Sequence, residues 1–340
     1  MNGVIIVDKP AGWTSHDVVN RMRRILGQRS VGHLGTLDPL ATGVLPLVTG
    51  SLTRLAQFYT ASEKKYEGVI RFGFATDTYD ADGEATGEPH PVTLALDQLQ
   101  QLSAGFLGLI EQMPPPFSAK KIHGVPAYKL ARKQKEVVLQ PVQVEVKEFV
   151  ITSLDADRAH FRARVASGTY MRSIAHEMGQ RLGCGAHLES LRRTAVAEFE
   201  IAQSHTIEEI ELCNVQLLAP SHSERVRANA SASRRIPAAV SLADHKVDAL
   251  DLSPDPDATE TRSVESLFVH PRKLLPQFPS VTADEPTIAR IRSGRPVNLP
   301  ELSRARQVKA FAGQSELIAI ATRVAGTLFH PKIVFPPDEM

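Results

Sequence analysis

The sequence lacks most of the features that mark secreted or membrane proteins. It has only two cysteines in 340 residues, Cys184 and Cys213. Two cysteines give no disulfide framework and fit a reducing compartment. No apolar run approaches the length of a membrane span, and the run 4–7 is too short for the core of a signal peptide. We therefore expect a cytoplasmic protein with no membrane association.

An excess of either charge is also missing. The formal net charge is +1, from 39 Lys and Arg against 38 Asp and Glu, which argues against a uniformly basic nucleic-acid binder. The basic residues are nevertheless concentrated, with five in segment 1–35 and seven in segment 117–147. Such segments either converge into a face that follows a phosphate backbone or are solvated helix faces, and charge alone leaves both interpretations open.

Complete metal and nucleotide motifs are absent too. In the acidic turn 76–83, a calcium-loop register would put Thr78 at the first ligand position and Pro89 at the twelfth, where a bidentate Glu belongs. The segment 184–187 has the spacing of half a zinc site, without a second pair of matching form. Neither phosphate-loop nor dinucleotide-binding motifs occur. We expect no metal and no nucleotide cofactor.

The local pattern of apolar residues predicts alternating helices and strands. Strands are predicted at 3–7, 66–74, 142–147 and 161–165. Helices are predicted from residue 14 with Ser15 as cap, at 93–108 with Thr93 as cap, at 127–135, at 170–182 ending at Gly183, and around 206–218. Residues 113–121 contain three consecutive prolines and should form an extended loop.

The composition changes after residue 219. Residues 220–265 are rich in Ala, Ser, Pro and Asp and almost free of aromatics, so we interpret them as a mobile linker or insertion. In the remaining segment, 282–285 has the form of a capping box, for a helix that ends at Gly294. Three short strands are predicted there, at 307–312, 316–322 and 330–335.

The stretch GHLGTLDPLATGVL, residues 32–45, has the strongest functional character. It holds one carboxylate, Asp38, between glycines that allow unusual backbone geometry and close approach, and Pro39 biases that acid toward an extended or turn conformation. Behind it, residues 44–48 are predicted to be a buried strand or a helix start. Taken alone, Asp38 could simply open an Asp-Pro turn.

Arg172 lies in the first turn of a predicted helix, where arginine is not favoured, which indicates either a local acidic partner or a tolerated surface residue.

These residues occur within a wider resemblance. Residues 32–43 resemble the signature of the TruB-type tRNA pseudouridine synthases. Further family motifs follow in order over roughly residues 1–200: Asn2-Gly3, Asp8-Lys9-Pro10, Lys65-Tyr66, the turn 76–80, Pro114-Pro115 with Ser118-Ala119 and Lys121, the segment 168–172, the segment 183–187 and Leu191-Arg192-Arg193. The C-terminal segment resembles a PUA-type RNA-binding module. Segment 133–141 departs from the family pattern, with Pro141 where Arg is frequent.

The resemblance implies an α+β fold, with a central mixed, largely antiparallel sheet and a small C-terminal β-rich domain. It implies a catalytic domain at 1–219, a linker or insertion at 220–265 and a PUA-like RNA-binding domain at 266–340. The implied reaction is the isomerisation of uridine 55 in the tRNA T loop to pseudouridine, with no cofactor. The tRNA T arm is then the partner, and no obligate protein partner is implied.

The resemblance also assigns roles to residues. Asp38 would be the essential acid, Arg172 the cation that holds it ionised, and Asp80 an acid that orients Arg172. Tyr66 would pack on the flipped base and is a candidate to take the C5 proton, although tyrosine is a poor base unless its pKa is lowered. Four residues would contact the substrate or line its pocket: His33, which would help to extrude the base, Tyr170, Leu191 and Lys9. Without the resemblance, Tyr66 and Tyr170 would be interpreted as ordinary core aromatics.

Two other classes of function remain open. Basic segments and an RNA-binding tail would also suit an RNA-binding or tRNA-folding module, but such a module does not need Asp38, Tyr66 and Arg172 together. A nucleosidase or hydrolase using Asp38 would instead release free uracil.

Overall fold

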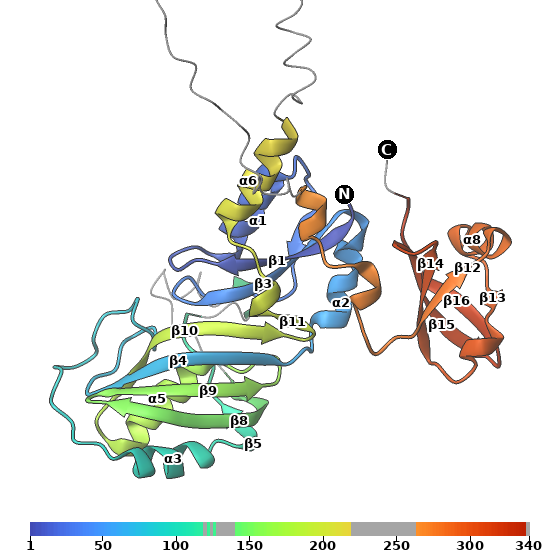
Figure 1. The fold of residues 1–340 in the computed structure, drawn as a ribbon. Helices are drawn as coiled ribbons and strands as arrows, with labels where there is room; N and C mark the ends of the chain where they lie inside the picture. Colours follow the sequence, from blue (N-terminus) through green and yellow to red (C-terminus); the bar gives the residue numbers. More distant parts are fainter. Residues whose placement is uncertain (118–120, 123–124, 127–139, 219–262, 338–340) are drawn as a thin grey trace, which may run out of the picture. The chain divides into compact units, whose positions relative to one another are not determined.

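The computed structural model describes residues 1–117, 121–122, 125–126, 140–218 and 263–337 (Figure 1). It divides into two units, one made of 1–207 with 268–340 and the other of 208–267. The predicted helix at 127–135, and most of the predicted linker at 220–265, lie outside the described residues. Among the helices of the described part of the chain, none is long and apolar enough to cross a membrane.

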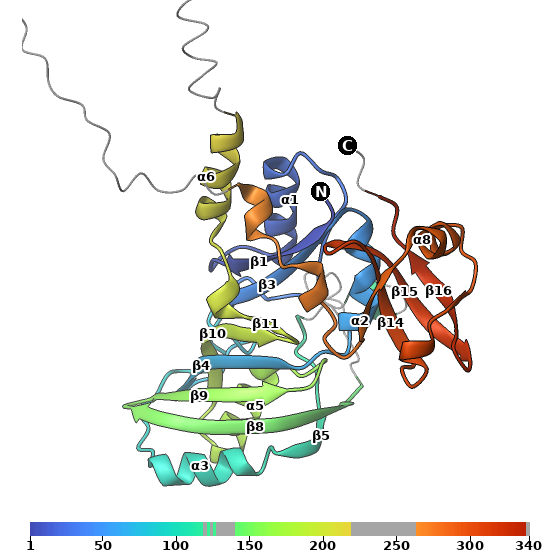
Figure 2. The ribbon, with the colours of Figure 1, turned by 45° about the vertical axis from the view of Figure 1, so that its right-hand side comes forward.

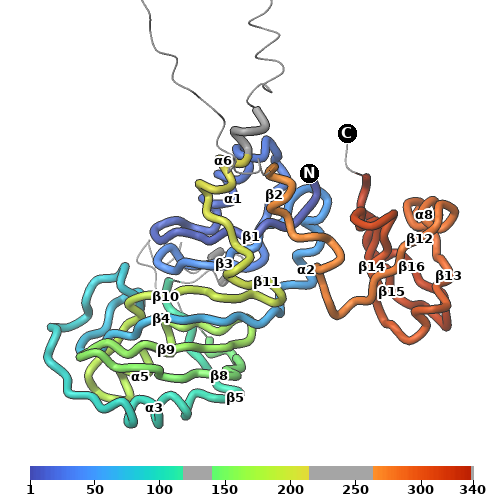
Figure 3. The backbone as a smooth tube through the Cα atoms, viewed as in Figure 1, coloured from blue at the N-terminus to red at the C-terminus, as the bar shows by residue number. Residues whose placement is uncertain are grey.

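A mixed sheet organises the N-terminal part of the first unit. Among the described residues its main path runs β1-β3-β10-β4-β9-β8-β5, while β2 pairs with β3 and β11 with β10. Every pairing in it is antiparallel except that of β3 with β10. The strands are β1 (Gly3–Lys9), β2 (Val31–His33), β3 (Thr42–Thr49), β4 (Lys64–Phe72), β5 (Gly108–Gln112), β8 (Val142–Asp155), β9 (Arg158–Val165), β10 (Ala186–Val196) and β11 (Phe199–Glu200). Figure 3 shows the backbone of β4 between β10 and β9.

The helices of this unit cover parts of that sheet. Helix α5 (Met171–Leu182) packs against β10, and α3 (Leu96–Ala104) lies along β8 (Figure 2). Helix α1 (Ser15–Ile25) packs against β2. The first unit also contains α2 (Ala56–Tyr59), the short strands β6 (Lys121–Ile122) and β7 (Val125–Pro126), and 3-10 turns at Gly50–Leu55, Ile201–Gln203, Pro271–Lys273 and Pro300–Leu302. Helix α6 (Ile207–Leu218), apart from its first residue, and a 3-10 turn at Val264–Leu267 belong to the second unit. Helix α5 ends as predicted, because Gly183 takes the left-handed conformation with φ of +74°.

Three predicted caps are wrong. Helix α1 is capped by Thr14, which forms a capping box with Asp17, because Ser15 is already helical and uses its hydroxyl in a tertiary contact. Helix α3 begins after Ala95 with no side-chain cap, so Thr93 has no such role. In segment 282–285, the strand β12 (Ser280–Ala283) takes the first two residues, and Asp284 caps the following helix by accepting from the backbone N–H of Thr287.

The C-terminal part, 268–337, is a second, five-stranded sheet in the order β12-β14-β15-β16-β13. Its further elements are α8 (Glu285–Arg292), β13 (Val297–Asn298), β14 (Gln307–Ala312), β15 (Glu316–Ala325) and β16 (Leu328–Val334). The three predicted strands correspond to β14, β15 and β16. Ile291 of α8 is buried with Val308, Ile318 and Phe329 in one apolar cluster. The α+β fold, with a largely antiparallel mixed sheet and a small β-rich C-terminal part, is therefore confirmed.

Candidate active site

The loop that carries Asp38 runs from β2 to β3 and is fixed at both ends. The Ser15 hydroxyl accepts a hydrogen bond from the Leu37 N–H at 2.8 Å and donates one to the Leu37 carbonyl at 3.1 Å. At the far end, Gly43 has φ of +100°, and a Cβ there would lie 2.2 Å from the carbonyl oxygen of Arg193. No other residue allows this close approach between β3 and β10, so the predicted need for glycine is confirmed at Gly43.

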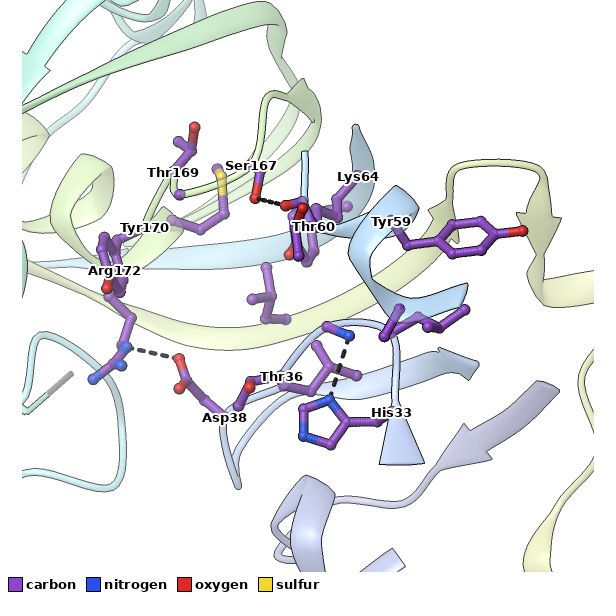
Figure 4. A pocket seen from close by; sticks show the side chains of 18 residues that line it. His33, Thr36, Asp38, Tyr59, Thr60, Lys64, Ser167, Thr169, Tyr170 and Arg172 are labelled. Carbon is purple, nitrogen blue, oxygen red and sulfur yellow. Dashed lines mark hydrogen bonds and ion pairs between the residues drawn. The ribbon is translucent and has the colours of Figure 1, made fainter. Parts of the chain in front are cut away.

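The side chains of Asp38 and Arg172 form an ion pair. The Arg172 Nε lies 2.9 Å from the Asp38 Oδ2, as an ion pair without hydrogen-bond alignment (Figure 4). The Arg172 side chain is 6% exposed while that of Asp38 is 39% exposed, so the carboxylate stays accessible and its partner is buried. Arg172 also donates to the carbonyls of Thr78 at 3.2 Å and Phe117 at 3.1 Å. The predicted local acidic partner of Arg172 is thus confirmed.

Asp80 holds the other side of the same guanidinium. Its Oδ2 lies 3.2 Å from the Arg172 Nη1, and its Oδ1 accepts from the Thr78 hydroxyl at 2.5 Å and from the Asp82 N–H at 3.2 Å. Burial raises the pKa of Asp80, and the bonds from Thr78 and Arg172 oppose that shift. Arg172 therefore lies between two carboxylates, of which only Asp38 is open to a substrate.

An aromatic stack supports the turn that carries Asp80. Tyr79 lies parallel to His176 of α5, with 3.7 Å between the ring centroids and 11° between the planes. Tyr79 has φ of +65°, a left-handed conformation that is unfavourable for a residue with a Cβ. Its carbonyl accepts from the Leu188 N–H at 3.0 Å. Since His176 lies one helical turn after Arg172, the stack joins the turn to the helix that carries the guanidinium.

A pocket of about 390 Å³ opens beside Asp38. Six residues singled out in the sequence line it: His33, Asp38, Tyr66, Tyr170, Arg172 and Leu191. Asp80 is absent from this lining. It borders a second pocket of about 660 Å³ on another side of Asp38, together with the first residues of α1.

The walls of the first pocket are held by backbone and packing contacts. The Gln112 side chain accepts from the Tyr170 N–H at 2.8 Å and donates to its carbonyl at 3.0 Å, which fixes Tyr170 at the start of α5. Tyr66 is buried in β4, and burial raises the pKa of its hydroxyl. His33 accepts from the Gly35 N–H at 3.3 Å, and burial lowers the pKa of its imidazole (Figure 4).

Lys9 lies beneath the loop and lines neither pocket. Its side chain is fully buried, and its Nζ donates to the carbonyls of Pro10 at 2.8 Å, Trp13 at 2.6 Å and Pro39 at 3.2 Å. Burial lowers the pKa of Lys9 to about 8, and the nearby Asp38 carboxylate opposes the shift. The contact with Pro39 ties Lys9 to the residue directly after the acid.

Arg193 is a component of the site to which the sequence assigned no role. Its fully buried guanidinium donates to the carbonyls of Val44 at 2.8 Å, Thr36 at 3.0 Å and Gly35 at 3.0 Å. It therefore holds the Asp38 loop against β10, the strand that pairs with β4. The sequence signal that could have found Arg193 was the pair of adjacent arginines after Leu191. Consecutive strand residues face opposite sides of a sheet, so the two side chains of such a pair lie in different surroundings.

Among the described residues, no group of three or more His, Cys, Asp or Glu side chains is arranged to hold a metal ion. His187, from the half zinc motif, places its Nδ1 at 3.2 Å from the carbonyl of Phe74.

Comparison with known proteins supplies the family. Residues 23–171 match the family model described as TruB family pseudouridylate synthase (N terminal domain), and residues 172–224 match the tRNA pseudouridylate synthase B C-terminal domain. A protein of Solibacter usitatus named tRNA pseudouridine synthase B is 46% identical over 338 residues, covering 98% of this chain and 100% of that protein. One of the same name from Opitutus terrae is 48% identical over 213 residues, covering 62% of this chain and 88% of that protein.

The solved structures agree on the fold. A chain from the crystal structure of a Cbf5-Nop10-Gar1 complex aligns with a TM-score of 0.63 and 22% identity, covering 98% of this chain and 85% of that one. A chain from an H/ACA RNP bound to a substrate RNA aligns with a TM-score of 0.61 and 21% identity, covering 99% of this chain and 86% of that one. Together with the family models and the near full-length relative, these findings show that the chain belongs to the TruB family of pseudouridylate synthases.

Proposed function

We propose that this protein isomerises uridine 55 in the T loop of tRNA to pseudouridine. The observation that carries the proposal is the pairing of Asp38 with Arg172 at the edge of a pocket lined by Tyr66 and Leu191. The names of the curated relatives support tRNA as the substrate. The base of a folded loop is stacked, so it must be everted before it can enter this pocket.

The reaction exchanges one bond to the ribose for another. The bond from N1 of uracil to C1′ breaks, the base turns, and C5 bonds to the same C1′ while the C5 proton is lost and N1 gains one. Asp38 serves this sequence by attack on the sugar, by attack on the base or by abstraction of a sugar proton. Each route needs an ionised carboxylate at the reacting atoms in a site with little water, which the Arg172 ion pair and the apolar walls supply.

The other residues position the reactants. Tyr66 packs on the base, and this role is favoured over proton transfer because burial raises the pKa of its hydroxyl. His33, Tyr170 and Leu191 complete the pocket. Asp80 orients Arg172 from behind. We assign Lys9 to holding the loop, because its ammonium already bonds to three backbone carbonyls.

We further propose the domain division given by the family resemblance. Residues 1–219 carry the chemistry, 220–265 join the two parts, and 266–340 form a PUA-like module that binds RNA. The compact five-stranded sheet with its own apolar cluster supports the last assignment.

A tritium-release assay tests the reaction. We expect the full-length protein to release about one tritium per molecule from a tRNA transcript labelled at C5 of its uridines, because only the target base loses its C5 proton. A transcript with cytidine at position 55 should release none. An RNA-binding module would release no tritium from either transcript, and a hydrolase would release free uracil; either result contradicts the proposed function.

The stack of Tyr79 on His176 gives a second prediction. Replacing His176 by Ala should lower single-turnover pseudouridine formation about 2- to 10-fold, because an aromatic pair contributes about 0.5–1.5 kcal/mol and this one holds the Asp80 turn against Arg172. RNA affinity should be unchanged. His176→Phe keeps a ring at the same place and should restore the rate. Equal rates for His176→Ala and His176→Phe would show that the stack does not position Asp80.

A further inference from the structure

Lys64 is the first residue of β4 and lies two residues before Tyr66, on the same face of the strand. It lines the pocket with Thr60 and Ser167, whose hydroxyl donates to the Thr60 carbonyl at 2.6 Å. Figure 4 shows Lys64 at the end of the pocket away from Asp38 and Arg172. The pocket thus has a cation at each end, and among the described residues an acid is paired with Arg172 but not with Lys64.

The charge of Lys64 has no counterpart within the described part of the chain. Its Nζ donates to the carbonyl of Ser62 at 2.7 Å, and no carboxylate of a described residue lies within ion-pair distance. The neighbouring acid, Glu63, is already engaged by Lys147 and by Arg164. The charged group that acts most directly on Lys64 is Arg193, which has the same sign, and burial together with Arg193 lowers the pKa of Lys64 to about 8.

A partly buried ammonium without an anion is costly, because desolvation disfavours the charged form. RNA carries a negative charge on every linkage, so a nucleotide in this pocket brings phosphates within reach of its rim. We propose that Lys64 binds a backbone phosphate next to the everted nucleotide and thereby supplies the pocket with an anion subsite opposite Arg172. The inference rests on the proposed function only in that RNA is the substrate.

The neighbouring residue provides a matched control. Lys65 is exposed and follows Lys64 in β4, so its side chain points to the opposite face of the sheet. Lys64→Met and Lys65→Met remove the same charge from adjacent positions, and Lys64→Arg keeps the charge in the pocket. Each full-length variant is to be compared with the wild type for binding to a T-arm hairpin across a range of salt concentrations. All of these proteins carry Asp38→Asn so that no turnover occurs, and the protein with no further substitution serves as the wild-type reference.

We expect Lys64→Met to weaken binding about tenfold at low salt and to reduce the slope of log K against log [salt] by roughly 0.7–1, the value for one lost phosphate contact. Lys65→Met should keep the wild-type slope, and Lys64→Arg should recover most of the affinity. If Lys64→Met keeps the wild-type slope, Lys64 does not bind phosphate and the inference is wrong.

Uncharged methylphosphonate linkages identify which backbone phosphate Lys64 contacts. Replacing the linkage on one side of uridine 55 by methylphosphonate should weaken wild-type binding about tenfold and leave the Lys64→Met variant unaffected. If neutral linkages on both sides weaken both proteins equally, Lys64 contacts another part of the nucleotide and the inference fails. Pseudouridine formation by the protein with Asp38 intact is scored separately. If that protein forms no pseudouridine, the proposed reaction is wrong. The salt slope and the linkage effects decide the role of Lys64 separately.

Discussion

Asp38→Asn is expected to lower pseudouridine formation by at least about 10⁴-fold, the scale on which enzymes lose rate when the reacting group itself is removed. The amide keeps the shape of the side chain but has no ionised oxygen for any of the three routes. RNA affinity should stay within a few fold, because Asp38 is a half-exposed residue of the pocket wall and not a phosphate contact. The measurement is single-turnover tritium release together with hairpin binding at fixed salt.

The fold of this variant should survive. Arg172 keeps its ion pair with Asp80 and its bonds to the carbonyls of Thr78 and Phe117 when Asp38 becomes neutral. Asp38→Glu retains the charge but lengthens the side chain. The carboxylate is then displaced from its position beside the reacting atoms, so most activity should again be lost. Unchanged turnover in Asp38→Asn would refute the assignment of the essential acid.

Local features of the fold were predictable from the sequence where neighbours in the chain decide the outcome. The alternation at 142–147 and 161–165 predicts strands, and β8 and β9 contain them. Gly183 ends α5 because the left-handed conformation it takes favours glycine. The Ser15 cap failed for a tertiary reason that the sequence does not show: its hydroxyl bonds to Leu37, 22 residues further along the chain.

The candidate site was predictable one residue at a time but not as an assembly. Arg172 in the first turn of a helix indicated an acidic partner, but the residues alone did not say which acid, and Asp38 is far away in the sequence. The family resemblance joined the two. The stack of Tyr79 on His176 gave no sequence signal, because it depends on how the 76–80 turn meets α5.

The sequence alone does not predict which of Arg192 and Arg193 is buried. A strand places two consecutive arginines on opposite faces, but what covers each face comes from distant parts of the chain: the Arg193 guanidinium lies against the Asp38 loop, whose carbonyls at Gly35 and Thr36 it bonds. The structure leaves the Arg192 side chain 42% exposed in an ion pair with Asp8 and buries Arg193 completely. One residue of the pair is a surface group and the other supports the site.

Arg193→Met is expected to destabilise the protein by about 2–5 kcal/mol, because it removes the donor from the buried carbonyl of Val44 and from the partly buried carbonyls of Gly35 and Thr36. Arg193→Lys should recover little of this, since one ammonium cannot serve three carbonyls in the geometry of a planar guanidinium. The measurement is the shift in urea and thermal midpoints of the full-length protein. Below the midpoint, the loosened loop should also lower turnover, because it no longer fixes Asp38 beside Arg172.

Arg192→Met is the matched control for this prediction. It removes the same guanidinium from the adjacent position, where the exposed ion pair with Asp8 contributes at most about 1 kcal/mol. The two midpoints should therefore separate clearly, although the two changes are identical in composition. Equal midpoints for the two variants would mean that water replaces the lost donors of Arg193, and that the Asp38 loop is held instead by Lys9 and Ser15.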